Sequence, residues 1–192
     1  FRLDPHRIEV VARHGGVTWV DDSKATNPHA AASSLSAYPG AIWVVGGLLK
    51  GVDIGPLVAG RGRAVKAAIV IGRSRDDVLA AFARHAPDVP VFEVEHGETE
   101  EVMRRVVQRA AGIAASGDVV LLAPASASFD QFSGYAERGT RFAEAVREHV
   151  GGLETESTNP AREHTRPEGD HEAGETDGDS DADTPPAGGP TG

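Results

Sequence analysis

The stretch Asp21-Asp22-Ser23-Lys24-Ala25-Thr26-Asn27-Pro28 lies between two regular elements and decides how the chain is arranged. The apolar run at 17–20 is typical of a β-strand, and the Ala-rich run that follows indicates a helix. Asn27-Pro28 is a helix-start signal, because Asn is a preferred N-cap and proline fits the first helical position. The free N–H groups of a helix N-terminus attract anions, and Lys24 adds a positive charge beside them. We therefore expect this loop to bind phosphate or carboxylate.

Outward from this loop, short apolar runs alternate with helical patterns. Two β-type runs at 8–12 and 17–20 flank Arg13-His14-Gly15-Gly16 and predict an N-terminal hairpin. The later predicted strands cover residues 41–45, 65–71, 89–94 and 119–122. The predicted helices cover residues 28–37, 55–59, 74–85, 98–115 and 136–149, and Ser74 to Asp77 resembles a capping box. After a β-hairpin, this alternation is typical of a three-layer, Rossmann-like α/β domain with a mostly parallel sheet.

Charge and apolar content divide the chain at about residue 150. Residues 151–192 hold 11 Asp or Glu and 2 Arg, and Leu153 is their one large apolar residue. Such a segment cannot bury enough surface to offset its chain entropy, so we expect a disordered acidic tail. Residues 1–150 match the size of one compact domain. The chain begins with Phe1 rather than Met, so we also expect a fragment of a longer protein, with a processed start as the alternative.

Composition excludes several functional classes. The absence of cysteine excludes disulfides and thiol catalysis, and the scattered histidines predict no metal site in this chain. The sequence has no cluster of basic residues, which argues against nucleic-acid binding. Because there is no long apolar run and no signal peptide, we expect a cytoplasmic protein without membrane insertion. The sequence also lacks a phosphate-loop motif and a dinucleotide-binding fingerprint, so it lacks the usual cradle for a triphosphate.

Three polar loops, residues 21–27, 46–51 and 123–132, follow predicted strands. Ligands of parallel sheets bind outside the carboxyl ends of the strands, so these loops predict one site. The chain has 16 Arg but only 3 Lys, and Lys24 and Lys50 lie in these loops, which favours a need for compact, mobile charges over chance. Other polar residues could contact a ligand or simply order the loops. They are Asp21, Asp22, Ser126, Ser128, Asp130 and Gln131.

The chain resembles the Mur ligase family at these positions. The resemblance rests on His6-Arg7, the string Asp21–Asn27, Gly46-Gly47 with Lys50, and the segment Ser126–Phe132. It covers about residues 4–150 and is similar to the C-terminal domain of members that add D-glutamate. It implies ATP-dependent joining of D-glutamate to UDP-N-acetylmuramoyl-L-alanine through an acyl phosphate, in peptidoglycan synthesis. It also implies that the phosphate loop and magnesium ligands lie in a missing central domain and the UDP site in a missing N-terminal domain, so this chain alone would be inactive.

The resemblance also implies roles for single residues. Lys24 would be catalytic and would contact ATP, and Thr26 would lie where ATP and D-glutamate meet. The implied nucleotide contacts are His6, Arg7, Asp22 and Lys24. The implied D-glutamate contacts are Thr26, Lys50, Ser128, Phe129 and Tyr135. Many relatives have an acid between Gly47 and Lys50, whereas this chain has Leu48-Leu49, which removes the polar side chain from that position.

Two other hypotheses stay open at this stage. The chain could be a free-standing α/β module that binds a nucleotide or a dicarboxylate and is regulated by its acidic tail. It could also be a truncated, inactive remnant. Other Mur ligases and folylpolyglutamate synthases share the implied fold, so the choice of D-glutamate depends on the string Asp21–Asn27.

Overall fold

A six-stranded sheet forms the centre of the domain in this computed structural model, which describes residues 5–157. The strands are β1 (Glu9–His14), β2 (Val17–Asp21), β3 (Ile42–Gly46), β4 (Ala67–Ile71), β5 (Val91–Glu93) and β6 (Val119–Leu122). Their order across the sheet is β1-β2-β6-β3-β4-β5, and only the β1–β2 pair is antiparallel. This arrangement confirms the predicted hairpin and the mostly parallel sheet. β5 lies at an edge, as the proline within its predicted run indicates.

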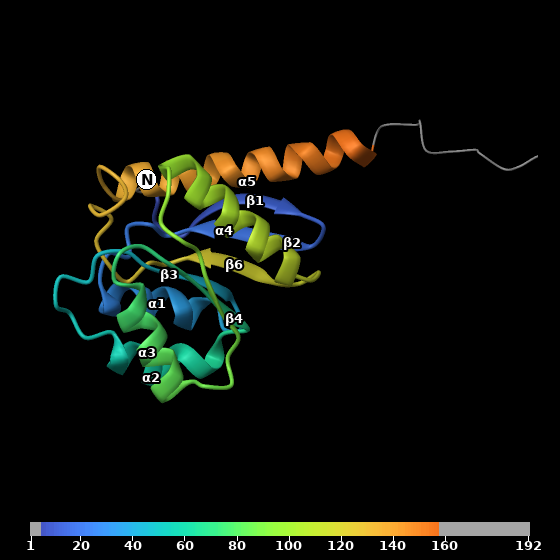
Figure 1. The fold of residues 1–192 in the computed structure, drawn as a ribbon. Helices are drawn as coiled ribbons and strands as arrows, with labels where there is room; N and C mark the ends of the chain where they lie inside the picture. The colour runs from blue at the N-terminus through green and yellow to red at the C-terminus, as the bar shows by residue number, and fades with distance from the viewer. Residues whose placement is uncertain (1–4, 158–192) are drawn as a thin grey trace, which may run out of the picture. The chain divides into compact units, whose positions relative to one another are not determined.

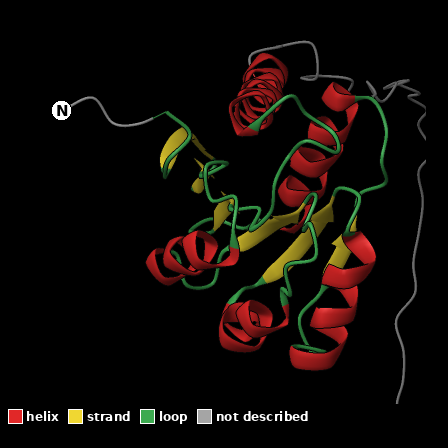
Figure 2. Ribbon diagram, turned by 90° about the vertical axis from the view of Figure 1, so that its left-hand side faces the viewer, coloured by secondary structure: helices red, strands yellow, loops and turns green. Residues whose placement is uncertain are grey.

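Helices cover both faces of the sheet (Figure 2). They are α1 (Pro28–Ala37), α2 (Gly55–Arg61), α3 (Arg75–His85), α4 (Thr99–Ile113) and α5 (Tyr135–Ser157), with the short 3-10 helix η1 (Gly62–Ala64). The apolar residues of α1, α2 and α3 pack on one face, and those of α4 and α5 pack on the other. The three-layer architecture is therefore confirmed. In Figure 1, α5 lies along the hairpin of β1 and β2.

The central strands supply both cores through side chains that alternate between the two faces. On β3, Trp43 and Val45 join the core under α1, α2 and α3, whereas Ile42 and Val44 join the core under α4 and α5. A strand buried on both faces needs apolar residues at every position, which explains the unbroken apolar run in the sequence. The indole Nε1 of Trp43 donates to the carbonyl oxygen of Ala123 at 2.7 Å. This bond satisfies a buried polar group and fixes the start of the loop after β6.

One predicted helix cap and one predicted helix end are wrong. The Ser74 side chain does not cap α3, because its hydroxyl accepts the backbone N–H of Leu49 at 3.2 Å instead. α5 does not end at residue 149 but continues to Ser157, so residues 151–157 are helical. Two glycines weaken the helix there, but helix formers such as Leu and Glu follow them. The predicted tail from residue 158 onward lies outside the described residues.

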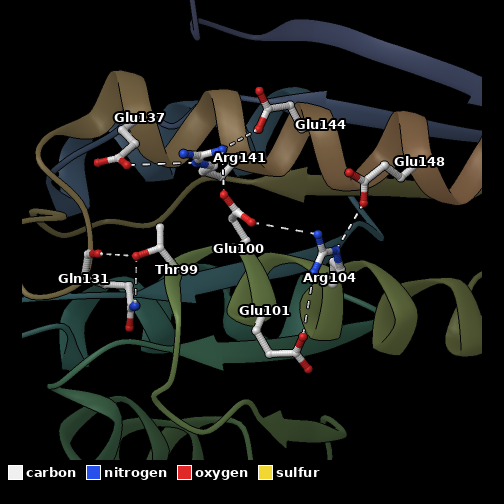
Figure 3. A network of polar contacts seen from close by, with 9 residues as sticks. All are labelled: Thr99, Glu100, Glu101, Arg104, Gln131, Glu137, Arg141, Glu144 and Glu148. Carbon is white, nitrogen blue, oxygen red and sulfur yellow. Dashed lines mark hydrogen bonds and ion pairs between the residues drawn. The ribbon is translucent and has the colours of Figure 1, made fainter.

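The outer sides of α4 and α5 are joined by ion pairs (Figure 3). Arg141 contacts Glu100 at 3.2 Å and Glu144 at 3.1 Å, and Arg104 contacts Glu148 at 3.2 Å. Exposed pairs of this kind contribute little to stability, so the buried apolar face of each helix holds it on the sheet. Between residues 5 and 157, no helix is both long enough and apolar enough to cross a bilayer.

Candidate functional site

The three polar loops start at the same edge of the sheet. Asp21, at the end of β2, and Val44, near the end of β3, both pair with Leu122 at the end of β6. The loops then bond to one another. Ala125 N–H donates to the Ala25 carbonyl at 2.9 Å, and Leu48 N–H donates to the Ala127 carbonyl at 2.9 Å. The prediction that these loops gather at one edge of the sheet is confirmed, and their role as a ligand site stays a prediction.

Glycines allow the loops to approach each other closely. Gly47 has a φ of 143°, and a Cβ there would lie 2.4 Å from the Ala127 carbonyl oxygen. Gly72, after β4, has a φ of 83°, and a Cβ there would lie 2.3 Å from the Gly47 Cα. A side chain at either position would displace backbone, so the glycines are needed for the packing of this edge.

A buried arginine of α5 holds two of the loops, and sequence analysis missed it. Arg138 is fully buried and donates to Ser23 Oγ and to the Ser23 carbonyl, both at 2.9 Å, and to the Ser126 carbonyl at 3.1 Å. Burial lowers the pKa of its guanidinium to about 10, and the charges of Asp130 and Asp21 oppose this decrease. No local sequence pattern distinguishes Arg138 from the other 15 arginines of the chain.

His6 and Asp21 form a hydrogen-bonded pair at the start of the first loop. His6 Nδ1 lies 2.7 Å from Asp21 Oδ2, and the other Asp21 oxygen accepts the Ser23 N–H at 2.8 Å. Burial raises the pKa of the Asp21 carboxyl, and the hydrogen bonds from His6 and Ser23 act against that increase. A Cβ on Gly139 would lie 2.3 Å from His6 Nδ1, so this glycine makes room for the pair beside α5. The pair fixes His6 at the edge where the loops gather.

Asp22 points into the protein. One carboxylate oxygen accepts the Ser34 hydroxyl, and the other accepts the Ile8 N–H at 3.3 Å. Burial raises the pKa of this carboxyl, although these two hydrogen bonds and the charge of Arg7 lower it. Asp22 therefore ties the first loop to α1 and to the segment before β1.

Two lysines of the site each lie over an aromatic ring, Lys24 over Tyr135 at the start of α5 and Lys50 over Phe129 in the loop before α5. Lys24 Nζ is 5.6 Å from the centre of the Tyr135 ring, and Lys50 Nζ is 5.2 Å from the centre of the Phe129 ring. Phe129 is 65% exposed, so the Lys50 ammonium is held at the surface rather than within the core. The two ammonium groups thus come from different loops, and they face the segment that runs from Phe129 to the start of α5.

Lys50 has a strained backbone. Its φ is 52° and that of Gly51 is 79°, and Val52 N–H donates to the Leu49 carbonyl at 3.0 Å, as in a type I′ turn. Such turns favour Asn or Gly, and a lysine there costs about 1 kcal/mol. In residues 5–157, the non-glycine residues with positive φ are His6, Ile8, Lys50 and Ala125, which all lie at this edge. Strain of this kind concentrates at functional sites.

The other predicted site residues also lie in these loops or next to them. Thr26 is half-buried and its N–H donates to the Lys24 carbonyl at 2.8 Å. Ser128 is buried, and its carbonyl accepts the Phe132 N–H at 2.8 Å. Arg7 is exposed, next to the His6 that pairs with Asp21. Asn27 caps α1, since its side chain accepts the Ala30 N–H at 3.0 Å, as the sequence predicts.

One group of side chains has the composition of a metal site. His6, Glu9 and Asp21 each offer a ligand atom, and these atoms lie within 4.8 Å of one another. The three side chains are already engaged in hydrogen bonds, because Glu9 accepts the backbone N–H of His6 at 3.1 Å and Asp21 pairs with the imidazole. This cluster therefore orders the start of the domain, and it lacks the set of free oxygen ligands that Mg²⁺ prefers.

Comparison with known proteins places the chain in a family context. Residues 6–126 match the family model described as "Mur ligase, glutamate ligase domain". The chain is 56% identical over 162 residues to the UDP-N-acetylmuramoylalanine--D-glutamate ligase of Leifsonia xyli subsp. xyli, a match that covers 84% of this chain and 31% of the relative. It is 48% identical over 172 residues to the protein of the same name from Mycobacterium avium, covering 77% of this chain and 35% of the relative. The chain thus spans about a third of the length of these relatives.

A solved structure shares the fold. The chain is similar to the crystal structure of UDP-N-acetylmuramate-alanine ligase from Thermotoga maritima, with a TM-score of 0.50 and 12% identity. The similarity covers 75% of this chain and 30% of the other. At this level of identity the match supports the fold alone.

Proposed function

The chain belongs to the Mur ligase family, and from this premise we propose that it is the C-terminal, amino-acid-binding domain of an ATP-dependent ligase. The ligase would add D-glutamate to UDP-N-acetylmuramoyl-L-alanine in the cytoplasm, as a step of peptidoglycan synthesis. We assign residues 1–150 to this domain, with α5 continuing to Ser157, and the acidic tail follows that helix in the sequence. The observation that carries the proposal is the pair of lysines, Lys24 and Lys50, presented from separate strand-end loops at one edge of the sheet. We define the full ligase as this chain together with the two preceding domains of such enzymes.

The proposed reaction has two steps, and both need positive charge. A carboxylate oxygen of UDP-N-acetylmuramoyl-L-alanine attacks the γ-phosphorus of ATP, so that an acyl phosphate forms and ADP leaves. The amine nitrogen of D-glutamate then attacks the acyl carbon, phosphate leaves, and the amine loses a proton. Negative charge spreads over phosphate and carboxylate oxygens in each step, and fixed cations stabilise it.

The two lysines suit these two steps. Lys24 follows the strand end beside His6, which supports its assignment as the catalytic cation that contacts ATP phosphate. Lys50 carries its ammonium on a strained turn, which supports its assignment as the partner of a D-glutamate carboxylate. The remaining assignments follow the family resemblance. Thr26, Ser128, Phe129 and Tyr135 would line the D-glutamate side, and His6, Arg7 and Asp22 would line the nucleotide side.

The residues at this edge of the sheet suit ATP but do not suit magnesium. The cations of the loops suit ATP, which supplies the phosphoryl group when bound, and Lys24, His6 and Arg7 would hold it. Asp21 and Asp22 do not suit magnesium, because their carboxylate oxygens are already engaged by hydrogen bonds inside the protein. We therefore assign magnesium to residues of the preceding domains and derive no step through it.

The test is an assay of the full ligase. Phosphate release should require ATP, UDP-N-acetylmuramoyl-L-alanine and D-glutamate together, and L-glutamate should not replace D-glutamate. Phosphate release that does not depend on D-glutamate would contradict the proposal. Tight binding of a nucleotide or a dicarboxylate by the 192-residue chain, without ligase activity of the full protein, would favour a free-standing binding module.

A further inference from the structure

The proposed reaction makes no direct use of the buried charge of Arg138. This side chain lies near the start of α5 and is fully buried, and its three hydrogen bonds go to uncharged oxygens of Ser23 and Ser126. Taking a charge out of water is costly, and exchanging a buried ionic group for well-packed apolar residues is often neutral or stabilising. A need for stability alone therefore does not explain an arginine at this position.

The hydrogen bonds of Arg138 join the two halves of the proposed site. Its Nε and Nη2 donate to Ser23, the residue before Lys24, which we assign to ATP phosphate. Its Nη1 donates to the carbonyl oxygen of Ser126, in the loop whose Ser128 we assign to D-glutamate. One side chain thus bonds to the loop of the phosphate half and to the loop of the D-glutamate half.

The guanidinium also packs against the loop that carries Lys50. A Cβ on Gly47 would lie 3.3 Å from Arg138 Nη1, so the missing side chain lets this loop approach the cation. A guanidinium is planar and holds its donors in a fixed geometry, so its contacts define directions as well as distances. Arg138 therefore fixes how the three strand-end loops lie relative to one another.

The second step of the proposed reaction needs both halves of the site. The amine nitrogen of D-glutamate must lie against the acyl carbon while the bond from that carbon to the phosphate oxygen breaks, and small errors of placement slow such a step strongly. The first step does not involve D-glutamate. We propose that Arg138 is a positioning residue that aligns D-glutamate with the acyl phosphate for amide formation. This inference rests on the proposed function, and Arg138 acts in it through Ser23 and Ser126.

Single-turnover kinetics of the full ligase separate the two steps. ATP and UDP-N-acetylmuramoyl-L-alanine alone should give ADP and the acyl phosphate, and added D-glutamate should then give the amide. Arg138→Lys keeps the charge but loses the planar fork, so we expect the rate constant of amide formation to fall about tenfold or more relative to that of ADP formation. Loss of folded enzyme lowers the amplitude of both signals and leaves their rate constants unchanged. An unchanged ratio of the two rate constants would overturn the proposal.

Two further variants complete the experiment. Ser23→Ala removes one acceptor of Arg138 and keeps the buried cation, so it should lower the same ratio by less, and it decides the matter if Arg138→Lys does not fold. Arg141→Lys is the matched control on the same helix, because its side chain forms exposed ion pairs, and it should leave the ratio unchanged.

The wild-type enzyme distinguishes the two ways in which this inference could fail. If the wild-type ligase forms no amide with D-glutamate, the proposed function fails and the positioning role fails with it. If the wild-type ligase forms the amide and neither Arg138→Lys nor Ser23→Ala changes the ratio, the positioning role alone is refuted.

Discussion

Arg138 donates two hydrogen bonds to Ser23, from Nε to the hydroxyl and from Nη2 to the carbonyl oxygen, both at 2.9 Å. The Ser23 hydroxyl in turn donates to the Tyr135 carbonyl at 2.7 Å, so Ser23 connects Arg138 to the first residue of α5. The start of α5 and the loop that carries Lys24 are thus closed onto each other around one buried side chain. A planar, five-donor guanidinium suits this position because it reaches several acceptors at once.

The first prediction concerns this guanidinium. Arg138→Lys should lower the free energy of unfolding by about 3 kcal/mol, because one ammonium cannot reach both Ser23 acceptors and Ser126. Arg141→Lys, on the same helix but in exposed ion pairs, should change it by less than about 1 kcal/mol. Urea unfolding of the 192-residue chain, followed by circular dichroism, measures both. Equal losses in the two variants would show that Arg138 does not organise the loops.

A second prediction concerns pH. Burial raises the pKa of the Asp21 carboxyl above its ordinary 3.8, so the folded protein holds this proton more tightly than the unfolded chain. The resulting stabilisation is complete below pH 3.8 and is lost as the pH rises through the folded-state pKa. Asp21→Asn should therefore make the free energy of unfolding fall less steeply as the pH rises toward 7. Part of the slope should remain, because burial also raises the pKa of the Asp22 carboxyl. Urea midpoints at a series of pH values measure this slope.

Asp118 provides the opposite case. Burial acts to raise its pKa, but the hydrogen bonds from Lys66 and the Ala115 N–H outweigh burial and lower it. Its stabilisation is present above pH 3.8 and is lost as the pH falls, so Asp118→Asn should steepen the decline with rising pH. The same direction of change in both variants would be incompatible with the assigned environments.

The third prediction concerns the glycines of the site edge. Gly72→Ala should destabilise the domain by about 2 kcal/mol or more, because the new Cβ would lie 2.3 Å from the Gly47 Cα and 2.6 Å from its nitrogen. Gly112→Ala, in α4 with open space around the new Cβ, should stabilise the helix by about 0.5–1 kcal/mol. Thermal unfolding of both variants tests this contrast. A neutral Gly72→Ala would mean that the turn after β4 can move away from Gly47.

The fourth prediction separates stability from function at Lys50. Lys50→Gly should raise the free energy of unfolding by about 1 kcal/mol, because glycine adopts positive φ without steric cost. The same change should impair the full ligase, because it removes the ammonium that we assign to D-glutamate. Urea unfolding and steady-state kinetics of the two proteins provide the measurements. A loss of stability would indicate that the lysine stabilises its own turn, through Phe129 for example.

The sequence predicted the fold well because the fold depends on apolar periodicity. The strand β6 begins and ends as its apolar run does, and the three loops gather at one edge because parallel strands carry their carboxyl ends to the same side. The structure also brings Lys24 and Lys50 to that edge, each over an aromatic ring.

Other features could not be predicted, because they arise from tertiary contacts. Arg138 is one arginine among 16 in the sequence, and only the packing of α5 against Ser23 and Ser126 buries it. The capping box at Ser74 failed because the loop after β3 competes for the hydroxyl. The hydrogen bonds of Asp22 to the Ser34 hydroxyl and the Ile8 N–H also depend on tertiary packing, which no local pattern specifies.

The most direct test of the central claim is the KM for D-glutamate of the full ligase carrying Lys50→Ala. Alanine at positive φ is as strained as lysine, so the substitution changes charge with little effect on stability. The account predicts a rise in the KM for D-glutamate of about tenfold or more, with the KM for ATP unchanged. Lys66→Ala, which removes a lysine paired with Asp118 at the opposite edge, should leave both constants unchanged. An unaltered KM for D-glutamate in Lys50→Ala would contradict the claim that this edge binds the amino acid.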